Sequence, residues 1–179
     1  FIFLPILDVL AGESATNLDS ETAEEKNRMW MFDLMVYANV PIVFGLMAFF
    51  FVQLQSHTYA MFELVGLLLS AGILLATNAI NVAHELGHRA SLPERLMSKL
   101  LYMPCLYMHF FIEHNFGHHM NVATPEDGAT ARFNQTVYGF WWTSVTKQYF
   151  NAWRLQAQLL KRQQLSFLSP KNDMLWYHL

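Results

Sequence analysis

Two long stretches of apolar residues dominate the hydrophobic pattern of the chain. Residues 34–53 and 64–83 contain no charged side chain, and a helix needs about 20 apolar residues to cross a bilayer. Pro41 lies inside the first stretch, and membrane-spanning helices tolerate proline. A short linker without Lys or Arg joins the two stretches. The pattern therefore predicts an all-α membrane protein, a bundle of transmembrane helices.

A third apolar stretch, residues 100–112, is too short to cross the membrane as a helix. Its 13 residues would rise about 20 Å, whereas the hydrocarbon core is about 30 Å thick. Pro104 and His109 interrupt this stretch. We therefore expect a segment that is re-entrant or lies at the interface, and we expect His109 to form a hydrogen bond within it.

Residues 134–179 mix aromatic and basic side chains, which is typical of amphipathic helices at the headgroup level. The distribution of basic residues also predicts an orientation. Lys26 and Arg28 precede the first span, and Arg89 follows the second. The positive-inside rule then places both of these regions in the cytoplasm and the linker outside.

Composition supports a membrane protein and excludes several other classes. Only 14% of the residues are charged, against about 25% in a typical soluble domain. The chain has no basic face for nucleic acid, and its single cysteine, Cys105, cannot form a disulfide framework. It begins at Phe1 inside an apolar run. We interpret residues 1–179 as one internal fragment of a longer membrane domain, with residues 1–7 ending an earlier span.

Candidate chemistry is concentrated in the histidines, because six of the eight fall between residues 84 and 119. His84 and His88 are four residues apart, a spacing that places both imidazoles on one face of a helix. His114 and His118 repeat this spacing, and His119 adds a further imidazole. Neutral imidazole binds Zn, Cu, Fe or Ni, so the two clusters predict a nitrogen-rich metal site.

The two histidine clusters can build one site only if they lie on the same side of the membrane. The interval of 25 residues between them holds the short stretch 100–112, which would have to enter the membrane and return. Four further residues are candidates for supporting this site through hydrogen bonds or charge: Asn81, Glu85, Glu113 and Asp127. Thr124-Pro-Glu-Asp127 is also typical of a helix start, with Thr124 as the N-cap, and this is our first interpretation of Asp127.

One interpretation of His84-Glu85-x-x-His88 is the zinc-protease motif, in which two His bind Zn and the Glu is the general base. This interpretation leaves the cluster of His114, His118 and His119 without a role. A metal-binding protein without turnover is the alternative that is not an enzyme.

The two clusters together resemble the histidine boxes of integral-membrane di-iron oxygenases and desaturases. The strings His84-Glu-Leu-Gly-His88-Arg and Glu113-His114-Asn-Phe-Gly-His118-His119 carry this resemblance, and Asn121-Val-Ala-Thr-Pro-Glu-Asp-Gly-Ala-Thr-Ala-Arg132 narrows it. With this continuation the chain is similar to the bacterial alkane 1-monooxygenase family over its whole length.

The resemblance implies a multi-pass protein of the bacterial inner membrane with its active site on the cytoplasmic side. It implies terminal hydroxylation of medium-chain n-alkanes to 1-alkanols with O2, at a non-haem site of two Fe ions. Rubredoxin, with its reductase, would supply electrons, and the alkane would arrive from the membrane. The metal ligands and catalytic residues implied are His84, His88, His114, His118 and His119.

The chain departs from the family pattern in one respect. The family's Asn-Tyr-x-Glu-His stretch and its further His-x-x-His-His box do not occur before Leu179, and His178 does not replace them. We therefore expect the isolated fragment to be inactive. A membrane xylene hydroxylase and a fatty-acid desaturase, which share this chemistry, are the near alternatives.

Overall fold

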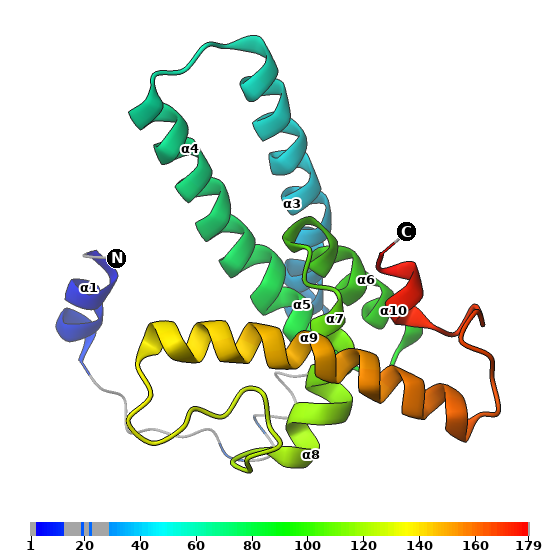
Figure 1. Cartoon of the computed structure of the whole chain (residues 1–179). Helices are drawn as coiled ribbons and strands as arrows, with labels where there is room; N and C mark the ends of the chain where they lie inside the picture. The colour runs from blue at the N-terminus through cyan, green and yellow to red at the C-terminus, as the bar shows by residue number, and fades with distance from the viewer. Residues whose placement is uncertain (1–2, 13–18, 20–21, 23–28, 179) are drawn as a thin grey trace. The chain divides into compact units, whose positions relative to one another are not determined.

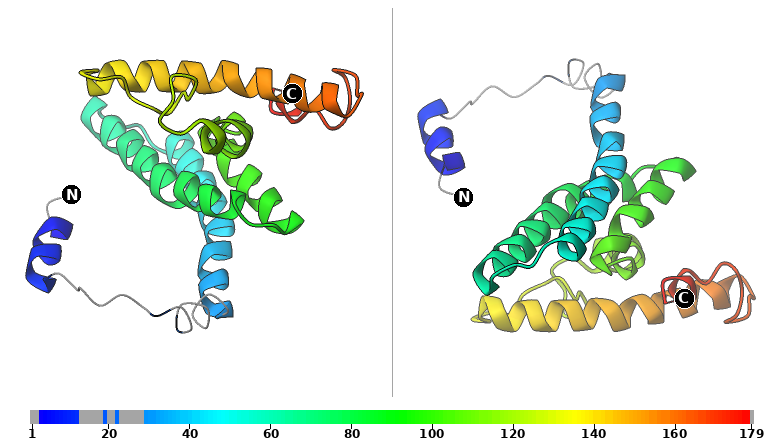
Figure 2. Two further views of the ribbon diagram at one scale, coloured as in Figure 1. Left: turned by 90° about the horizontal axis from the view of Figure 1, so that it is seen from below. Right: turned by 90° about the horizontal axis from the view of Figure 1, so that it is seen from above.

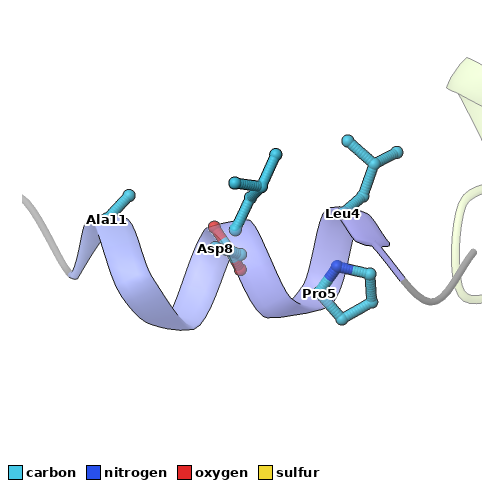
Figure 3. Close-up of a pocket in the computed structure, with 5 residues that line it drawn as sticks. Leu4, Pro5, Asp8 and Ala11 are labelled. Atoms are coloured by element: carbon cyan, nitrogen blue, oxygen red, sulfur yellow. The ribbon is translucent and has the colours of Figure 1, made fainter.

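The computed structural model describes residues 3–12, 19, 22 and 29–178. Phe1–Val36 and Tyr37–Leu179 form two separate compact units. In the first unit, α1 spans Phe3–Ala11, and the shallow pocket in Figure 3 is lined by residues of α1 alone. The expectations for Lys26, Arg28 and the start of the chain at residues 1–2 lie outside the described residues.

Two long apolar helices carry the predicted spans. Helix α3 covers Trp30–Ser56. The second helix is continuous over Met61–Gly87 and consists of α4 (Met61–Leu74), the π-helix η1 (Leu75–Ile80) and α5 (Asn81–Gly87). Both helices are long and apolar enough to cross a membrane, and only 6% of the apolar window of each is buried, as expected for surfaces that face lipid. After the linker the chain runs back antiparallel to α3 (Figure 1).

A helical hairpin follows these two helices. Helix α6 (Leu92–Tyr102) starts at Ser91, whose hydroxyl oxygen accepts a hydrogen bond from the backbone N–H of Glu94 at 3.4 Å. The chain reverses after the 3-10 turn η2 (Met103–Cys105), where Leu106 adopts the left-handed conformation. It continues into α7 (His109–Glu113), the π-helix η3 (His114–His118) and α8 (His119–Asn121). The re-entrant placement of 100–112 in a bilayer stays a prediction.

The C-terminal part consists of α9 (Val137–Arg162) and α10 (Asp173–Trp176). Helix α9 packs across the α7–η3 segment, as both sets of views show (Figures 1 and 2). The hydrophobic core sits among α5, α6, α7, α9 and α10, and its fully buried members include Leu86, Leu101, Ile112, Ala152 and Met174. This core holds together the elements that carry the histidines.

The predicted helix start at Thr124 is wrong. No helix begins there; residues 122–136 form turns and loops. The Thr124 hydroxyl donates to the carbonyl of Asn121 at 2.7 Å, so it closes the preceding helix instead. The Asp127 carboxylate accepts from the backbone N–H of Ala129 at 2.9 Å, the pattern of an Asx-turn, which competes with helix formation.

Candidate metal centre

Four imidazole nitrogens converge between α5 and the α7–α8 segment. Nε2 of His114 lies 2.7 Å from Nε2 of His84, 3.1 Å from that of His88 and 3.1 Å from that of His119. The Nε2 atoms of His84 and His88 are themselves 3.1 Å apart. His114 is buried, whereas His88 and His119 are exposed, so the cluster opens to the surface on one side. The structure therefore brings both histidine clusters into one group.

The spacing of these nitrogens fits a shared cation. Two nitrogens that bind one ion at right angles, with bonds of about 2.1 Å, lie about 3 Å apart. Mutual hydrogen bonds do not account for the cluster, since Nε2 of His114 faces three other Nε2 atoms and has one proton or one lone pair to offer. Burial and the neighbouring imidazoles lower the pKa of His114 to about 3, which leaves its ring neutral and able to bind a metal. His84, His88 and His114 each offer a nitrogen within 4.8 Å of the others, so these three residues could hold one ion.

A π-helical turn sets the geometry of the second cluster. Residues 114–118 are wound as the π-helix η3, not as the α-helix that the spacing of His114 and His118 predicts. In a π-helix the hydrogen bonds run from i to i+5, and His119 is five residues after His114. The Nε2 of His119 therefore meets that of His114, while the ring of His118 stacks on His114 at 5.2 Å. His114 and His118 therefore lie side by side as their spacing predicts, but the turn is π-helical and His119, not His118, brings its Nε2 to that of His114.

His118 is held by a carboxylate instead of by another imidazole. Its Nδ1 lies 3.1 Å from both carboxylate oxygens of Asp127. Asp127 is buried, and burial alone would raise its pKa, but hydrogen bonds from Thr130, Ala129 and His118 hold this pKa below its usual value. The ionised carboxylate accepts the Nδ1 proton, so Nε2 of His118 keeps its lone pair for a metal. Metal-binding histidines are commonly oriented by such carboxylates.

Glu113 is completely buried beside the cluster. Its Oε1 accepts a hydrogen bond from the amide of Asn151 in α9 at 3.1 Å, and its Oε2 has no partner among the described residues. Burial raises the pKa of this carboxyl, and the hydrogen bond from Asn151 opposes the shift. Gly117 permits this close packing, because a Cβ there would come within 3.0 Å of Leu155, Asn151 and Glu113.

The other two supporting candidates lie at the surface. Glu85 is 58% exposed and pairs with Arg89 at 3.4 Å, and Arg89 also binds Glu94 at 2.7 Å. Asn81 is exposed one turn before His84, and its side chain has no hydrogen bond within the described residues. Asp127 therefore contacts His118 directly, and Glu113 is buried between α7 and α9. Glu85 and Asn81 lie at the surface, outside the centre.

Two further histidines lie apart from the centre. His109 is buried. We expected it to form a hydrogen bond, but its Nε2 has no hydrogen-bond partner among the described residues. Its ring packs against Tyr107 and Tyr149 instead. His178 hydrogen-bonds to Tyr149 at 2.9 Å and is not part of the imidazole cluster.

Sequence reasoning missed the residues that fix the centre from a distance. Asn151 belongs to α9, about one turn past Gln148, and nothing in the local pattern distinguishes it from a surface amide. Thr130 donates to Asp127 at 2.5 Å from within a loop. The one available signal was Gly117, a glycine inside a histidine cluster, where a close approach of another element is a common reason for glycine.

Exposed apolar helices beside imidazoles from two separate helices define an integral-membrane protein with a polyhistidine metal centre. The family comparison agrees with this class: the fatty acid desaturase family model matches residues 59–179. The chain belongs to the fatty acid desaturase family.

Curated relatives narrow the similarity within this family. The chain is 37% identical over 174 residues to an alkane 1-monooxygenase of Pseudomonas putida, an alignment that covers 96% of this chain and 42% of the relative. It is 34% identical over 172 residues to alkane 1-monooxygenase 1 of Alcanivorax borkumensis, an alignment that covers 96% of this chain and 42% of that relative. A xylene/toluene monooxygenase hydroxylase component of P. putida is 27% identical over 165 residues, an alignment that covers 90% of this chain and 43% of that relative. The chain thus spans under half the length of these relatives.

Proposed function

We propose that the full-length protein containing this chain is a membrane alkane 1-monooxygenase that hydroxylates the terminal methyl group of medium-chain n-alkanes with O2. The observation that carries the proposal is the convergence of His84, His88, His114 and His119. Relatives named alkane 1-monooxygenase are 30–37% identical over nearly the whole chain, which supports this reaction within the family.

In the proposed centre, His84, His88, His114, His118 and His119 bind two Fe ions. The donor set supports this choice, because it is rich in neutral imidazole and contains no thiolate. Bound iron with external electrons would supply the dioxygen chemistry that an unactivated methyl group requires. The role of Asp127 is to keep His118 in the tautomer that binds metal through Nε2. The role of Glu113 is to place a buried carboxyl group, held by Asn151, next to the ligand His114 in the chain.

The substrate would enter from the membrane, since an alkane dissolves in the hydrocarbon core. Candidate lining residues are Phe44, Met47 and Leu67, which are half-buried, and Ile73, which is exposed. Shortening or enlarging an inward-facing member of this set should shift the preferred chain length. Substitution at Leu69, which is 63% exposed, should not do so.

Rubredoxin, kept reduced by its reductase, is the proposed electron donor, and the proposed location is the inner membrane of a bacterium with the centre facing the cytoplasm. The location rests on the positive-inside pattern around the two spans. The exposure of His88 and His119 supports access for an electron donor from one side of the centre.

The zinc protease is a weaker alternative. Its general base would be Glu85, which is mostly exposed and paired with Arg89. His114 of the second cluster lies within 2.7 Å of His84, so the first motif does not act alone. A xylene hydroxylase remains the second candidate, because a relative of that name aligns over 90% of the chain.

The direct test uses the full-length protein in detergent with reduced rubredoxin, octane and 18O2. We expect labelled 1-octanol from the wild-type protein and from His57→Ala, a control in the exposed linker. His84→Ala should abolish the product. Turnover of xylene in place of octane, insertion of a double bond into a fatty acid, or product of equal yield from His84→Ala would contradict the proposal.

A further inference from the structure

A continuous series of aromatic rings leads from the proposed metal ligand His114 to the C-terminal part of the chain. Phe110 stacks on His114 with ring centroids 4.9 Å apart, and Tyr107 stacks on Phe110 at 5.1 Å. His109 follows at 4.7 Å from Tyr107, and Tyr149 at 5.3 Å from His109. All four separations are those of rings in van der Waals contact, the spacing at which single electrons move readily between side chains.

The series continues beyond Tyr149 toward the surface. The ring of His178 lies 5.7 Å from that of Tyr149, and Trp153 lies 5.4 Å from His178. Phe167 stacks on Trp153 at 6.0 Å and is 54% exposed. Tyr149 therefore occupies an intermediate position, linked by rings to the proposed centre on one side and to exposed residues on the other.

The hydrogen bond between Tyr149 and His178 has a defined direction. Nδ1 of His178 lies 2.7 Å from the carbonyl oxygen of Met174, which can only accept, so Nδ1 carries the proton. Nε2 of neutral His178 then has a lone pair, and the Tyr149 hydroxyl donates to it at 2.9 Å. A phenol that loses an electron becomes strongly acidic and must release its proton. Tyr149 has a base in place to receive that proton.

Tyr107 lacks such a base, although it lies nearer to the proposed centre. Its hydroxyl donates to the amide oxygen of Gln148 at 2.7 Å, and an amide oxygen is a very weak base. Burial raises the pKa of Tyr107 to about 12, so its proton is held firmly. Tyr107 can pass an electron through its ring, but Tyr149 is the position at which the positive charge can be stabilised.

We infer that Tyr149 and His178 form a redox-active pair that discharges unused oxidising equivalents from the metal centre. This inference rests on the proposed function. Tyr149 loses one electron, which passes along the rings to His114 and reduces the oxidised centre by one equivalent, and its phenolic proton moves to Nε2 of His178. A small thiol then returns one electron to the tyrosyl radical, and the proton returns from His178. Two such cycles convert two thiols into one disulfide and release their two protons.

Such a pair has a clear use in this chemistry. An oxidant that attacks an unactivated methyl group would also attack the surrounding imidazoles and aromatic rings if no substrate were bound. A nearby tyrosine with a base beside it is oxidised more easily than the ligands, so the oxidation takes place away from them. The pair would therefore protect the centre when dioxygen is consumed without alkane.

The test uses the full-length protein loaded with iron, reduced, exposed to O2 without alkane and frozen within milliseconds to seconds. We expect a tyrosyl radical in the EPR spectrum, narrowed when the protein is made with ring-deuterated tyrosine. Tyr149→Phe should abolish the signal, and His178→Phe should diminish it while iron content stays that of the wild type. Tyr138→Phe, a control at an exposed tyrosine of the same helix, should keep it.

Other results overturn the inference and separate it from the proposed function. Full iron content and octane turnover with no radical, or a radical unchanged in Tyr149→Phe, would remove the pair and leave the oxygenase intact. A radical narrowed by deuterated tryptophan and absent from Trp153→Phe would move the site to Trp153. A protein that binds no iron would refute the proposed function itself, and the inference with it.

Discussion

Nδ1 of His118 lies 3.1 Å from both carboxylate oxygens of Asp127, nine residues further along the chain. The carboxylate is buried and is fixed in turn by the Thr130 hydroxyl. This chain of hydrogen bonds turns the lone pair of His118 Nε2 away from Asp127, where a metal can use it. The loop that follows the second histidine cluster thus contributes to the centre although it supplies no ligand.

Asp127→Asn should weaken metal binding without unfolding the protein. The amide keeps the size of the side chain but removes the charge that orients His118, and losses of this kind typically cost about 10- to 100-fold in metal affinity. Competition with a chelator on the full-length protein measures the change. Glu126→Gln is the matched control, since Glu126 is exposed; equal affinities in the two variants would show that Asp127 plays no part.

Gly117→Ala should destabilise the contact between η3 and α9. The new Cβ would lie 2.9 Å from Leu155 and 3.0 Å from Asn151 and Glu113, and overpacking of this kind costs about 1–3 kcal/mol. Thermal unfolding in detergent should show a lower midpoint. Gly72→Ala, where nothing lies within 4 Å of the added atom, should leave the midpoint unchanged or raise it. An unchanged midpoint in Gly117→Ala would show that η3 and α9 do not pack tightly at this position.

Ser98→Ala should loosen α6 from the helix that carries His84. The buried Ser98 hydroxyl donates to the carbonyl of Ala83 at 2.6 Å, and a buried hydrogen bond contributes about 1 kcal/mol. Ser70→Ala is the control, because Ser70 is exposed and bonds only within its own helix. The midpoint of thermal unfolding is measured for both variants. An equally small decrease in each would show that the hydrogen bond from Ser98 to Ala83 contributes little to stability.

His109 should make stability depend on pH. Burial lowers its pKa from 6.5 to about 4, so between these values the unfolded chain takes up a proton that the folded chain does not. Stability is therefore present in full above pH 6.5 and falls as the pH is lowered toward 4. In His109→Phe this decline should be shallower, by up to about 1.4 kcal/mol per pH unit.

The control for this experiment is His57→Phe, which replaces an exposed imidazole. It should keep the wild-type dependence of the unfolding free energy on pH. Parallel curves for His109→Phe and the wild type would show that His109 titrates normally in the folded protein.

The sequence predicted the elements whose signal is local. The apolar stretches 34–53 and 64–83 lie inside long helices, and the four-residue spacing of His84 and His88 brings their Nε2 atoms to 3.1 Å at the C-terminal end of α5. Hydrophobic length and helical periodicity predict these features. The same reasoning brought the two histidine clusters together, because one short interval separates them.

The errors arose where a distant contact or an unusual helix decides the outcome. The π-helical turn shifts the second cluster so that His119, not His118, meets His114 at the nearest nitrogen. Asp127 bonds to His118 and its own loop, which replaces the helix start predicted at Thr124. Asn151 reaches Glu113 across 38 residues, and no local pattern indicates such a pair.

The most direct test of the central claim is the metal content of the full-length protein purified in detergent, measured beside His114→Ala and the control His57→Ala. His114 is the imidazole that joins the two clusters. We expect two irons per chain in the wild type and in His57→Ala, and loss of one or both in His114→Ala. One zinc per chain, retained in His114→Ala, would contradict it and assign the metal to His84 and His88 alone.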